Sequence, residues 1–195
     1  MKSFPTSILL GAAALLPLSC AFVVHDDSEH EHARAVIVET SAAPSVQKAT
    51  CVMHATAGNE AVKGVVKFTQ TAGGVLVEAR IEGLTPGLHG FHVHEFGDLD
   101  CADGMCTGGH FNPTAEAHGS PDAAVRHAGD MGNLEAGANG VAEYKRLDTR
   151  IKLNGPDSIL GHGLVIHAKA DDFTTQPTGN AGARLATGVI GSAKP

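Results

Sequence analysis

The segment from Gly90 to Asp130 constrains this chain most, because it gathers side chains that commonly bind metal ions. It contains His92, His94, His110, His118, His127 and Asp130, and His167 follows later at the end of an apolar run. A single histidine more often lies at the surface or in a satisfied hydrogen-bond network. Several imidazoles with a carboxylate, in place of a set of thiolates, favour a copper or zinc centre over a cysteine-rich structural zinc site.

His92 and His94 alternate with the apolar residues Phe91 and Val93. On a β-strand, neighbouring side chains project to opposite faces. The pattern therefore predicts two imidazoles on one face and two apolar side chains in a core. The later histidines and Asp130 lie among Gly, Pro, Asn, Ser and Asp, which is typical of a long loop. Such a loop in a compact domain needs something to hold it, and a bound metal would do so.

Short apolar stretches between glycine-rich turns predict an all-β domain. The expected strands are 51–53, 64–69, 75–81, 140–147, 150–153, 164–167 and 188–190, and 70–74 joins the second strand to the third. No stretch shows a sustained helical period, so an antiparallel sandwich or barrel is favoured. Because the chain has no Trp and one Tyr, its core has to consist of Val, Ala, Ile, Leu and Phe.

The beginning of the chain has the features of an export signal. Lys2 precedes an apolar stretch at 8–18, and small residues follow up to Ala21. This order predicts a secretory signal peptide that is cleaved after Ala21. Two alternatives stay open: lipid attachment at Cys20, as in bacterial lipoproteins, and an uncleaved membrane anchor. We expect export to the periplasm or the extracellular medium, with membrane anchoring only if Cys20 is lipidated.

The predicted organisation is a signal peptide at 1–21, a linker at 22–48 and one domain at 49–195. In the linker, His25, His30 and His32 stand among acidic residues. They could capture a metal ion, but dense charge and low hydrophobicity favour a disordered linker. The formal net charge of −7 argues against nucleic-acid binding. An anionic substrate would need local positive charge near the site.

Five motifs together resemble the copper/zinc superoxide dismutase family, in a bacterial-type, exported form. They are GLHGFHVHEFGD, GGHFNP, HGSPDAAVRHAGDMGNL, LVIHAKADD and TGNAGARLATGVIG, in this order along residues 49–195. The resemblance implies an antiparallel Greek-key β-barrel or sandwich with long metal-binding and electrostatic loops. It also implies disproportionation of superoxide to dioxygen and hydrogen peroxide by a redox-cycling copper that one histidine bridges to a structural zinc.

Carried onto matching positions, the resemblance assigns every site residue. It gives the copper ligands as His92, His94, His110 and His167, and the zinc ligands as His110, His118, His127 and Asp130. His110 serves twice because the family bridges its two metals with one deprotonated imidazole. Asp171 matches a carboxylate that joins a copper ligand to a zinc ligand through hydrogen bonds. Arg184 matches the arginine that attracts and orients the anion.

The cysteines depart from the family pattern. Members usually bond a loop cysteine to a cysteine three residues after the arginine, where this chain has Thr187. In an oxidising compartment we expect a Cys101–Cys106 disulfide instead. So small a ring should contribute only about 2 kcal/mol, and it would stiffen the loop without tying it to the barrel. A Cys-x4-Cys metal site is the alternative, and Cys51 is expected to be a buried free thiol.

The segment between His167 and Arg184 is shorter than in the eukaryotic members, and it lacks their acidic and lysine cluster. The family's homodimer is left open, with Gly161, His162 and 188–191 as a candidate interface.

Two other classes of function compete: a copper-binding or delivery protein on the same fold, and a structural module with incidental histidines. The complete ligand set with an anion-guiding arginine favours the enzyme.

Overall fold

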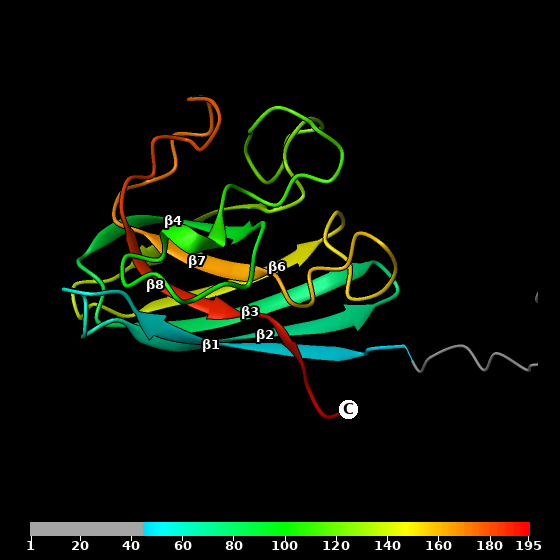
Figure 1. Cartoon of the computed structure of the whole chain (residues 1–195), viewed down its shortest axis with the longest axis horizontal. Helices are drawn as coiled ribbons and strands as arrows, with labels where there is room; N and C mark the ends of the chain where they lie inside the picture. The colour runs from blue at the N-terminus through cyan, green and yellow to red at the C-terminus, as the bar shows by residue number, and fades with distance from the viewer. Residues whose placement is uncertain (1–44) are drawn as a thin grey trace, which may run out of the picture. The chain divides into compact units, whose positions relative to one another are not determined.

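A computed structural model describes residues 45–195, and its strands form a single antiparallel sheet (Figure 1). The strands are β1 (Lys48–Ala55), β2 (Lys63–Thr71), β3 (Gly74–Glu82), β4 (Gly87–His94), β5 (Asp130–Ala136), β6 (Ala142–Asp148), β7 (Gly163–His167), β8 (Arg184–Val189) and β9 (Gly191–Ser192). The predicted signal peptide, Cys20 and the histidines at 25, 30 and 32 lie outside the described residues.

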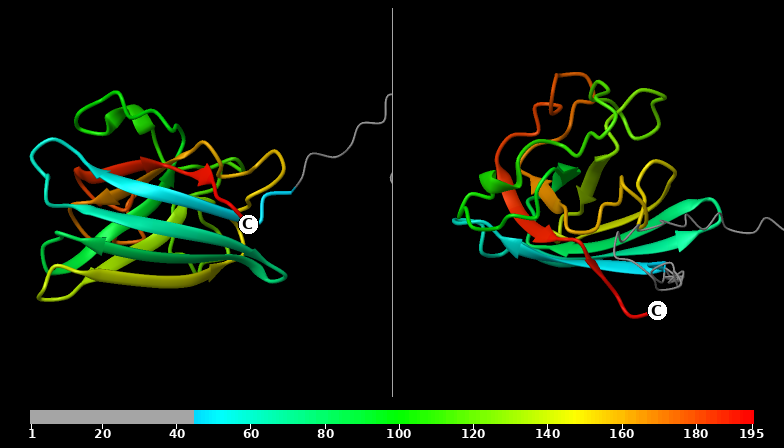
Figure 2. Two further views of the ribbon diagram at one scale, coloured as in Figure 1. Left: turned by 90° about the horizontal axis from the view of Figure 1, so that it is seen from below. Right: turned by 45° about the vertical axis from the view of Figure 1, so that its right-hand side comes forward.

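The sheet closes on itself into a barrel. Its strand order is β2-β3-β6-β5-β4-β7-β8-β1-β9, and β1 also pairs with β2, which joins the two ends (Figure 2). β3 lies beside β6, and β4 beside β7, so strands distant in the chain become neighbours as in a Greek key. The predicted antiparallel Greek-key barrel is confirmed.

The barrel interior is filled by the alternate residues of the strands. In β3, for example, Val75, Val77, Ala79 and Ile81 are buried while their neighbours are less so. The predicted core of Val, Ala, Ile, Leu and Phe is confirmed, with Cys51, Met53 and Met131 added to it. The single tyrosine, Tyr144, packs its ring against Phe91 with centroids 5.4 Å apart and donates a hydrogen bond from its hydroxyl to the Met131 carbonyl.

Three expectations about strands were wrong. Residues 130–136 form β5, although Asp130 was expected in a loop. Residues 150–153 form no strand, because the Asp148 side chain accepts the amides of Arg150 and Ile151 and turns the chain. Ile151 and Leu153 are buried in this loop, which explains the misleading alternation. β8 begins at Arg184, well before 188, because it pairs with β7 along its length.

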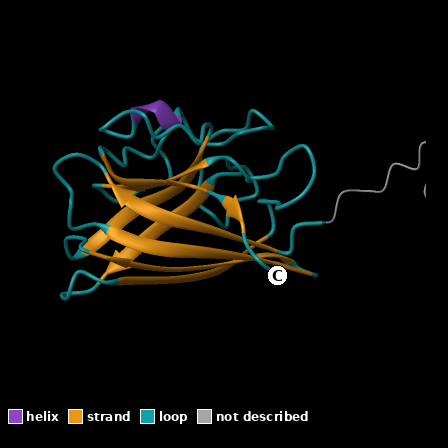
Figure 3. Ribbon diagram, turned by 60° about the horizontal axis from the view of Figure 1, so that its bottom comes forward, coloured by secondary structure: helices purple, strands orange, loops and turns teal. Residues whose placement is uncertain are grey.

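Two long loops, 95–129 and 168–183, lie on the same side of the barrel (Figure 1). Within the described part of the chain, the one helix is a short 3-10 turn at Met105–Thr107 in the first of these loops (Figure 3). The predicted Cys101–Cys106 disulfide is confirmed, and Cys51 is a buried free thiol whose burial raises its pKa to about 12. No helix among residues 45–195 is long and apolar enough to cross a membrane.

Candidate metal centre

Strands β4 and β7 carry three of the predicted ligands. His92 and His94 are 0% and 1% exposed on β4, and His167 ends the neighbouring strand β7. Phe91 and Val93 project to the opposite face into the core, as the alternation predicts. Gly90 lets the second long loop approach, because a Cβ there would lie 2.8 Å from the Ala181 Cβ. The sheet itself therefore fixes this part of the site.

The remaining ligands come from the first long loop and from the start of β5. His110 is drawn to the barrel by an isolated bridge to His94, and Asp130 stands opposite His92 in the β4–β5 register. The structure brings all the predicted ligands into two buried groups. The first cluster is His92, His94, His110 and His167, and the second cluster is His110, His118, His127 and Asp130. Within each cluster, the candidate ligand atoms lie within 4.8 Å of one another.

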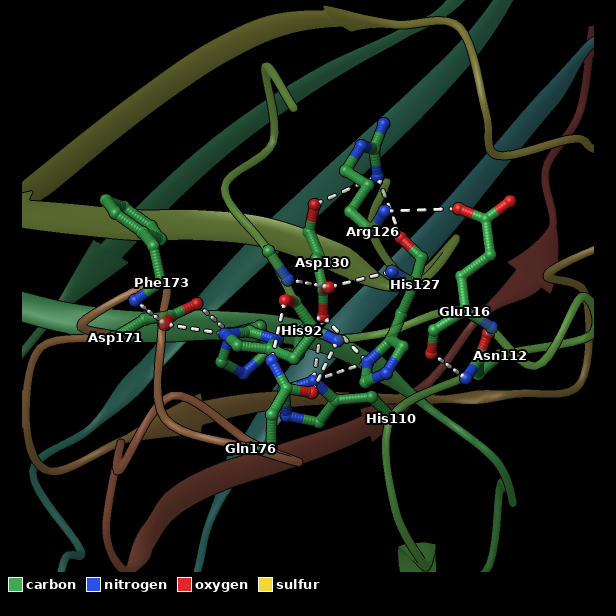
Figure 4. Close-up of polar contacts among 12 residues, drawn as sticks. His92, His110, Asn112, Glu116, Arg126, His127, Asp130, Asp171, Phe173 and Gln176 are labelled. Atoms are coloured by element: carbon green, nitrogen blue, oxygen red, sulfur yellow. Dashed lines mark hydrogen bonds and ion pairs between the residues drawn. The ribbon is translucent and has the colours of Figure 1, made fainter. Parts of the chain in front are cut away.

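Several buried imidazole nitrogens have no hydrogen-bond partner. They are His92 Nδ1, His110 Nε2 and His118 Nδ1; the last of these lies 3.0 Å from Asp130 Oδ1 but without the geometry of a hydrogen bond. The other nitrogen of each ring contacts a carboxylate at 2.8 Å: His92 Nε2 and His118 Nε2 on Asp171, and His110 Nδ1 on Asp130 (Figure 4). An unpaired buried polar atom is costly. Lone pairs left free in this way fit a metal ion.

The nitrogens also converge as ligands do around a cation. His110, His118 and His127 each place Nδ1 within 3.2 Å of the same oxygen, Asp130 Oδ1. In the first cluster, the Nε2 atoms of His94 and His167 face each other at 3.3 Å, while their Nδ1 atoms lie against backbone carbonyls. Imidazoles held in this tautomer, with one carboxylate in the second cluster, suit copper and zinc.

The two clusters differ in charge. Burial, followed by repulsion from neighbouring imidazoles, lowers the pKa of His167 to about 3 and that of His94 well below its usual value. Burial also lowers the pKa of His110 to about 4, against the opposing effect of Asp130. In the second cluster, burial lowers the pKa of His118, but its close contacts with the carboxylates of Asp130 and Asp171 outweigh the effect of burial and raise the pKa to about 9.

Two side-chain amides that the sequence did not reveal hold the backbone of Asp171 and of the ligand His118 in place. Asn133 accepts the Asp171 amide at 2.7 Å and donates to the Asp171 carbonyl at 3.0 Å. Gln176 does the same for His118, at 2.8 and 2.9 Å (Figure 4). Both residues use a side-chain amide, which offers a donor and an acceptor together. No local pattern marks them, because their partners lie far away in the chain.

Arg126 is a further residue that the sequence analysis missed. It is 2% exposed, donates to the carbonyls of His127 and Asp130 at 3.1 and 3.0 Å, and pairs with buried Asp148 at 2.7 Å. The charge pair thus ties the loop that carries the second cluster to the end of β6. In the sequence, the only sign of this role is that Arg126 stands next to His127. That position does not distinguish a buried arginine from a surface one.

Arg184 lies beside the first cluster, opposite His167 in the β7–β8 register. Its guanidinium donates to the carbonyls of Gly104 and Gly108 and, at 2.7 Å, to the Thr107 hydroxyl. These acceptors are neutral oxygens, so they leave the positive charge uncompensated. Partial burial lowers the pKa of Arg184, and the carboxylate of Asp103 opposes that shift. A fixed cation next to buried imidazoles is suited to attracting a small anion.

The fold and the site define a Greek-key β-barrel protein with two adjoining histidine-rich metal sites. A family model described as copper/zinc superoxide dismutase matches residues 62–190. Superoxide dismutase (Cu-Zn) 2 of Mesembryanthemum crystallinum is 50% identical over 153 residues, covering 75% of this chain and 96% of that protein. The chain therefore belongs to the copper/zinc superoxide dismutase family.

Two further comparisons agree. The extracellular superoxide dismutase (Cu-Zn) of Onchocerca volvulus is 40% identical over 199 residues, covering 95% of this chain and 96% of that protein. The crystal structure of the clock protein EA4 superposes on this chain with a TM-score of 0.72 and 40% sequence identity. The match covers 78% of this chain and 99% of that one. The predicted family is confirmed, whereas its bacterial-type form stays a prediction.

Proposed function

We propose that this chain disproportionates superoxide to dioxygen and hydrogen peroxide at a centre that holds one copper and one zinc ion. The first cluster (His92, His94, His110 and His167) would hold copper, and the second cluster (His110, His118, His127 and Asp130) would hold zinc. The observation that carries the proposal is the position of His110. Its Nδ1 lies against Asp130 in the second cluster, while its Nε2 is buried without a partner.

The bound metals would supply a one-electron redox couple at copper and a fixed positive charge at zinc. The chain's own residues perform the other tasks. Arg184 attracts the anion and orients it, since three oxygens hold its guanidinium in place. With Nδ1 of His110 engaged in the second cluster, Nε2 would be the nitrogen that binds copper, and when it is released from the metal it would be the one to take up a proton and pass it to the reduced substrate. Overall, two superoxide ions and two protons give one dioxygen and one hydrogen peroxide.

Asp171 has a positioning role in this proposal. Its two carboxylate oxygens contact His92 Nε2 and His118 Nε2, each at 2.8 Å, and so connect the first cluster to the second. A carboxylate on the far nitrogen fixes the tautomer and the ring orientation of a ligating histidine. Burial would raise the pKa of Asp171, but hydrogen bonds from these histidines outweigh it and keep the pKa well below its usual range.

The chain is an exported protein in this proposal. The relative from Onchocerca volvulus, which matches nearly the whole chain, is named extracellular. The Cys101–Cys106 disulfide suits an oxidising compartment. A periplasmic location, lipid attachment at Cys20 and the boundaries 1–21, 22–48 and 49–195 stay predictions.

A second copy of the chain is the proposed partner of one barrel face. Val52 on β1, Phe96 after β4 and Val189 on β8 are 51%, 50% and 38% exposed. Gly97 and Gly161 pack together beside Val189, and they lie near the expected interface of Gly161, His162 and 188–191. Exposed apolar side chains over adjoining segments favour a homodimer. Sedimentation equilibrium of the wild type and of Phe96→Asp tests this, and a monomeric wild type would reject it.

The test of the function is the rate of superoxide decay in the presence of protein loaded with copper and zinc, with metal content measured on the same sample. We expect one copper and one zinc per chain, and a fast rate that falls as salt screens Arg184. Arg184→Ala should lower the rate and its salt dependence while both metals stay bound. Arg80→Ala, at an exposed ion-paired arginine, is the control. Full metal content without activity would reject the enzyme and favour copper binding or delivery.

A further inference from the structure

The three groups that hold the Arg184 guanidinium belong to one short segment of the first long loop, residues 101–109. They are the Gly104 carbonyl, the Thr107 hydroxyl and the Gly108 carbonyl. Thr107 is fully buried, and Gly104 is buried as well. The position of the arginine head therefore depends on the shape of this segment, because β8 fixes only the backbone of Arg184.

The two ends of the segment are fixed to the barrel and its turns. At one end, the Ala57 amide donates to the Ala102 carbonyl at 2.8 Å. At the other, the Phe96 amide donates to the Thr107 carbonyl at 3.0 Å, and the Glu95 amide donates to the Gly109 carbonyl at 2.9 Å. These contacts hold Thr107 and, through its neighbours, Gly108. They reach Gly104 only indirectly, through the hydrogen bonds from Thr107 to its carbonyl.

Apart from Arg184, Gly104 has hydrogen-bond partners only within the segment. Its amide donates to the Cys101 carbonyl at 2.9 Å, and its carbonyl accepts the Thr107 amide and hydroxyl at 3.2 and 3.0 Å. Its φ of 75° lies in the left-handed region, where glycine is the least constrained residue. Ordering a turn that contains such a glycine costs conformational entropy, and a covalent closure lowers that cost. The Cys101–Cys106 disulfide, with Cα atoms 5.4 Å apart, closes this turn around Gly104.

We propose that the Cys101–Cys106 disulfide is a positioning element for Arg184. By closing a ring around Gly104, it keeps the Gly104 carbonyl directed at the guanidinium and so holds the anion-binding head beside the first cluster. The segment is also in contact with β8, since a Cβ at Gly104 would lie 2.7 Å from Thr187 Cγ2. The loop is thus tied to the barrel through Arg184 itself, a link that the sequence analysis did not foresee.

This inference rests on the proposed function, because it takes Arg184 as the group that binds the anion. The test compares Cys101→Ser/Cys106→Ser with the wild type, both loaded with copper and zinc. We expect unchanged metal content and a rate at low salt that is lower by about three- to tenfold, as when one hydrogen bond to a charged group is weakened. The dissociation constant of azide, an anionic probe followed by copper absorption, should rise by a similar factor.

Met105→Ala is the matched control. Met105 lies inside the same disulfide ring, is 60% exposed, and is not one of the residues that accept hydrogen bonds from Arg184. This variant keeps the disulfide and should retain the wild-type rate and azide affinity. Equal losses in Met105→Ala would show that any change in the turn has this effect, and would overturn a specific role of the disulfide.

A double-mutant cycle separates this proposal from the proposed function. In an Arg184→Ala background, removing the disulfide should change neither the rate nor azide binding further. If Arg184→Ala alone changes neither quantity, the role of Arg184 in the proposed function fails. If Arg184→Ala lowers both but the cysteine variant behaves as wild type, the positioning role alone fails. Loss of metal, aggregation or unfolding of the cysteine variant would assign the disulfide to stability and also contradict the positioning role.

Discussion

The two clusters share His110 but are built in different ways. In the first cluster, His92, His94 and His167 lie on paired strands, and their pKa values are all lowered. The second cluster takes three histidines, including His110, from a long loop and arranges them around Asp130. The first cluster is thus held by the sheet as neutral rings, and the second by charge and by contacts between loops. Damage to the loops should release zinc before copper.

The largest effect is expected from Asp130→Asn. The Asp130 carboxylate accepts contacts from three imidazoles and from the backbone amides of Gly119 and His127. Losing its charge should weaken zinc binding by more than about 100-fold, since it is both a ligand and the centre of the network. Chelator competition measures the zinc, and visible absorption follows the copper. Asp122→Asn, at an exposed acid paired with Arg146, is the control. Equal loss of both metals would contradict the claim that the first cluster is held by the sheet independently of the second.

Asp171→Ala should have the next largest effect. It frees His92 Nε2 and His118 Nε2 together. We expect zinc affinity to fall by about 10- to 100-fold. Copper affinity should fall less, because β4 continues to hold His92. The two dissociation constants, measured separately, check this order, with Asp157→Ala at the surface as control. A larger effect on copper would contradict it.

The unfolding free energy of the metal-free protein should depend on pH through the histidines of both clusters. His110 and His167 have folded pKa values of about 4 and about 3, below the ordinary 6.5, so the unfolding free energy should fall as pH drops from 6.5 towards 4. His118 has a folded pKa of about 9, above the ordinary 6.5. The stability that its protonated form contributes is therefore complete below pH 6.5 and is lost as pH rises to 9. Each proton changes stability by at most about 1.4 kcal/mol per pH unit.

Urea unfolding of the metal-free protein between pH 4 and 9 measures these slopes. The midpoint should be highest near the ordinary histidine pKa of 6.5. His118→Asn should remove the fall above that pH, and His167→Asn should reduce the fall below it. A slope above pH 6.5 that persists in His118→Asn would show that another group is responsible.

The smallest effect is expected from Gln176→Ala. Gln176 holds the backbone of His118 from the opposite loop, through one bond that it donates and one that it accepts. Because these bonds are partly exposed, zinc should dissociate only about two- to fivefold faster. Hydrogen exchange at the His118 amide should also accelerate. Thr174→Ala, in the same loop, should change neither quantity. A Gln176→Ala protein that releases zinc at the wild-type rate would contradict a role for Gln176 in holding the zinc ligand His118.

The residues on strands were the easiest to predict from the sequence. The spacing of His92 and His94 fixed their shared face, since strand geometry leaves little choice. The division of ligands between the metals came from the family resemblance, because loop residues carry no periodicity. The Cys101–Cys106 bond was predicted from the expected oxidising compartment and from Thr187, which stands where the family has its usual partner cysteine.

The supporting contacts could not be predicted. Arg126, Asn133 and Gln176 bind backbone groups whose positions depend on the path of entire loops. The expected strand at 150–153 failed for a related reason. Alternating burial of Ile151 and Leu153 also arises in a loop when a side chain such as Asp148 caps its backbone amides. Sequence patterns report burial more directly than they report pairing.

The central claim, that His110 belongs to both clusters, is tested most directly by electron paramagnetic resonance of protein that holds Cu(II) in the first cluster and Co(II) in place of zinc. A bridging His110 imidazolate predicts that the Cu(II) signal nearly disappears, because the two paramagnetic ions are coupled through the ring. Protein with Zn(II) in the second cluster should show the full Cu(II) signal. An unchanged Cu(II) spectrum with both ions bound would contradict the shared histidine.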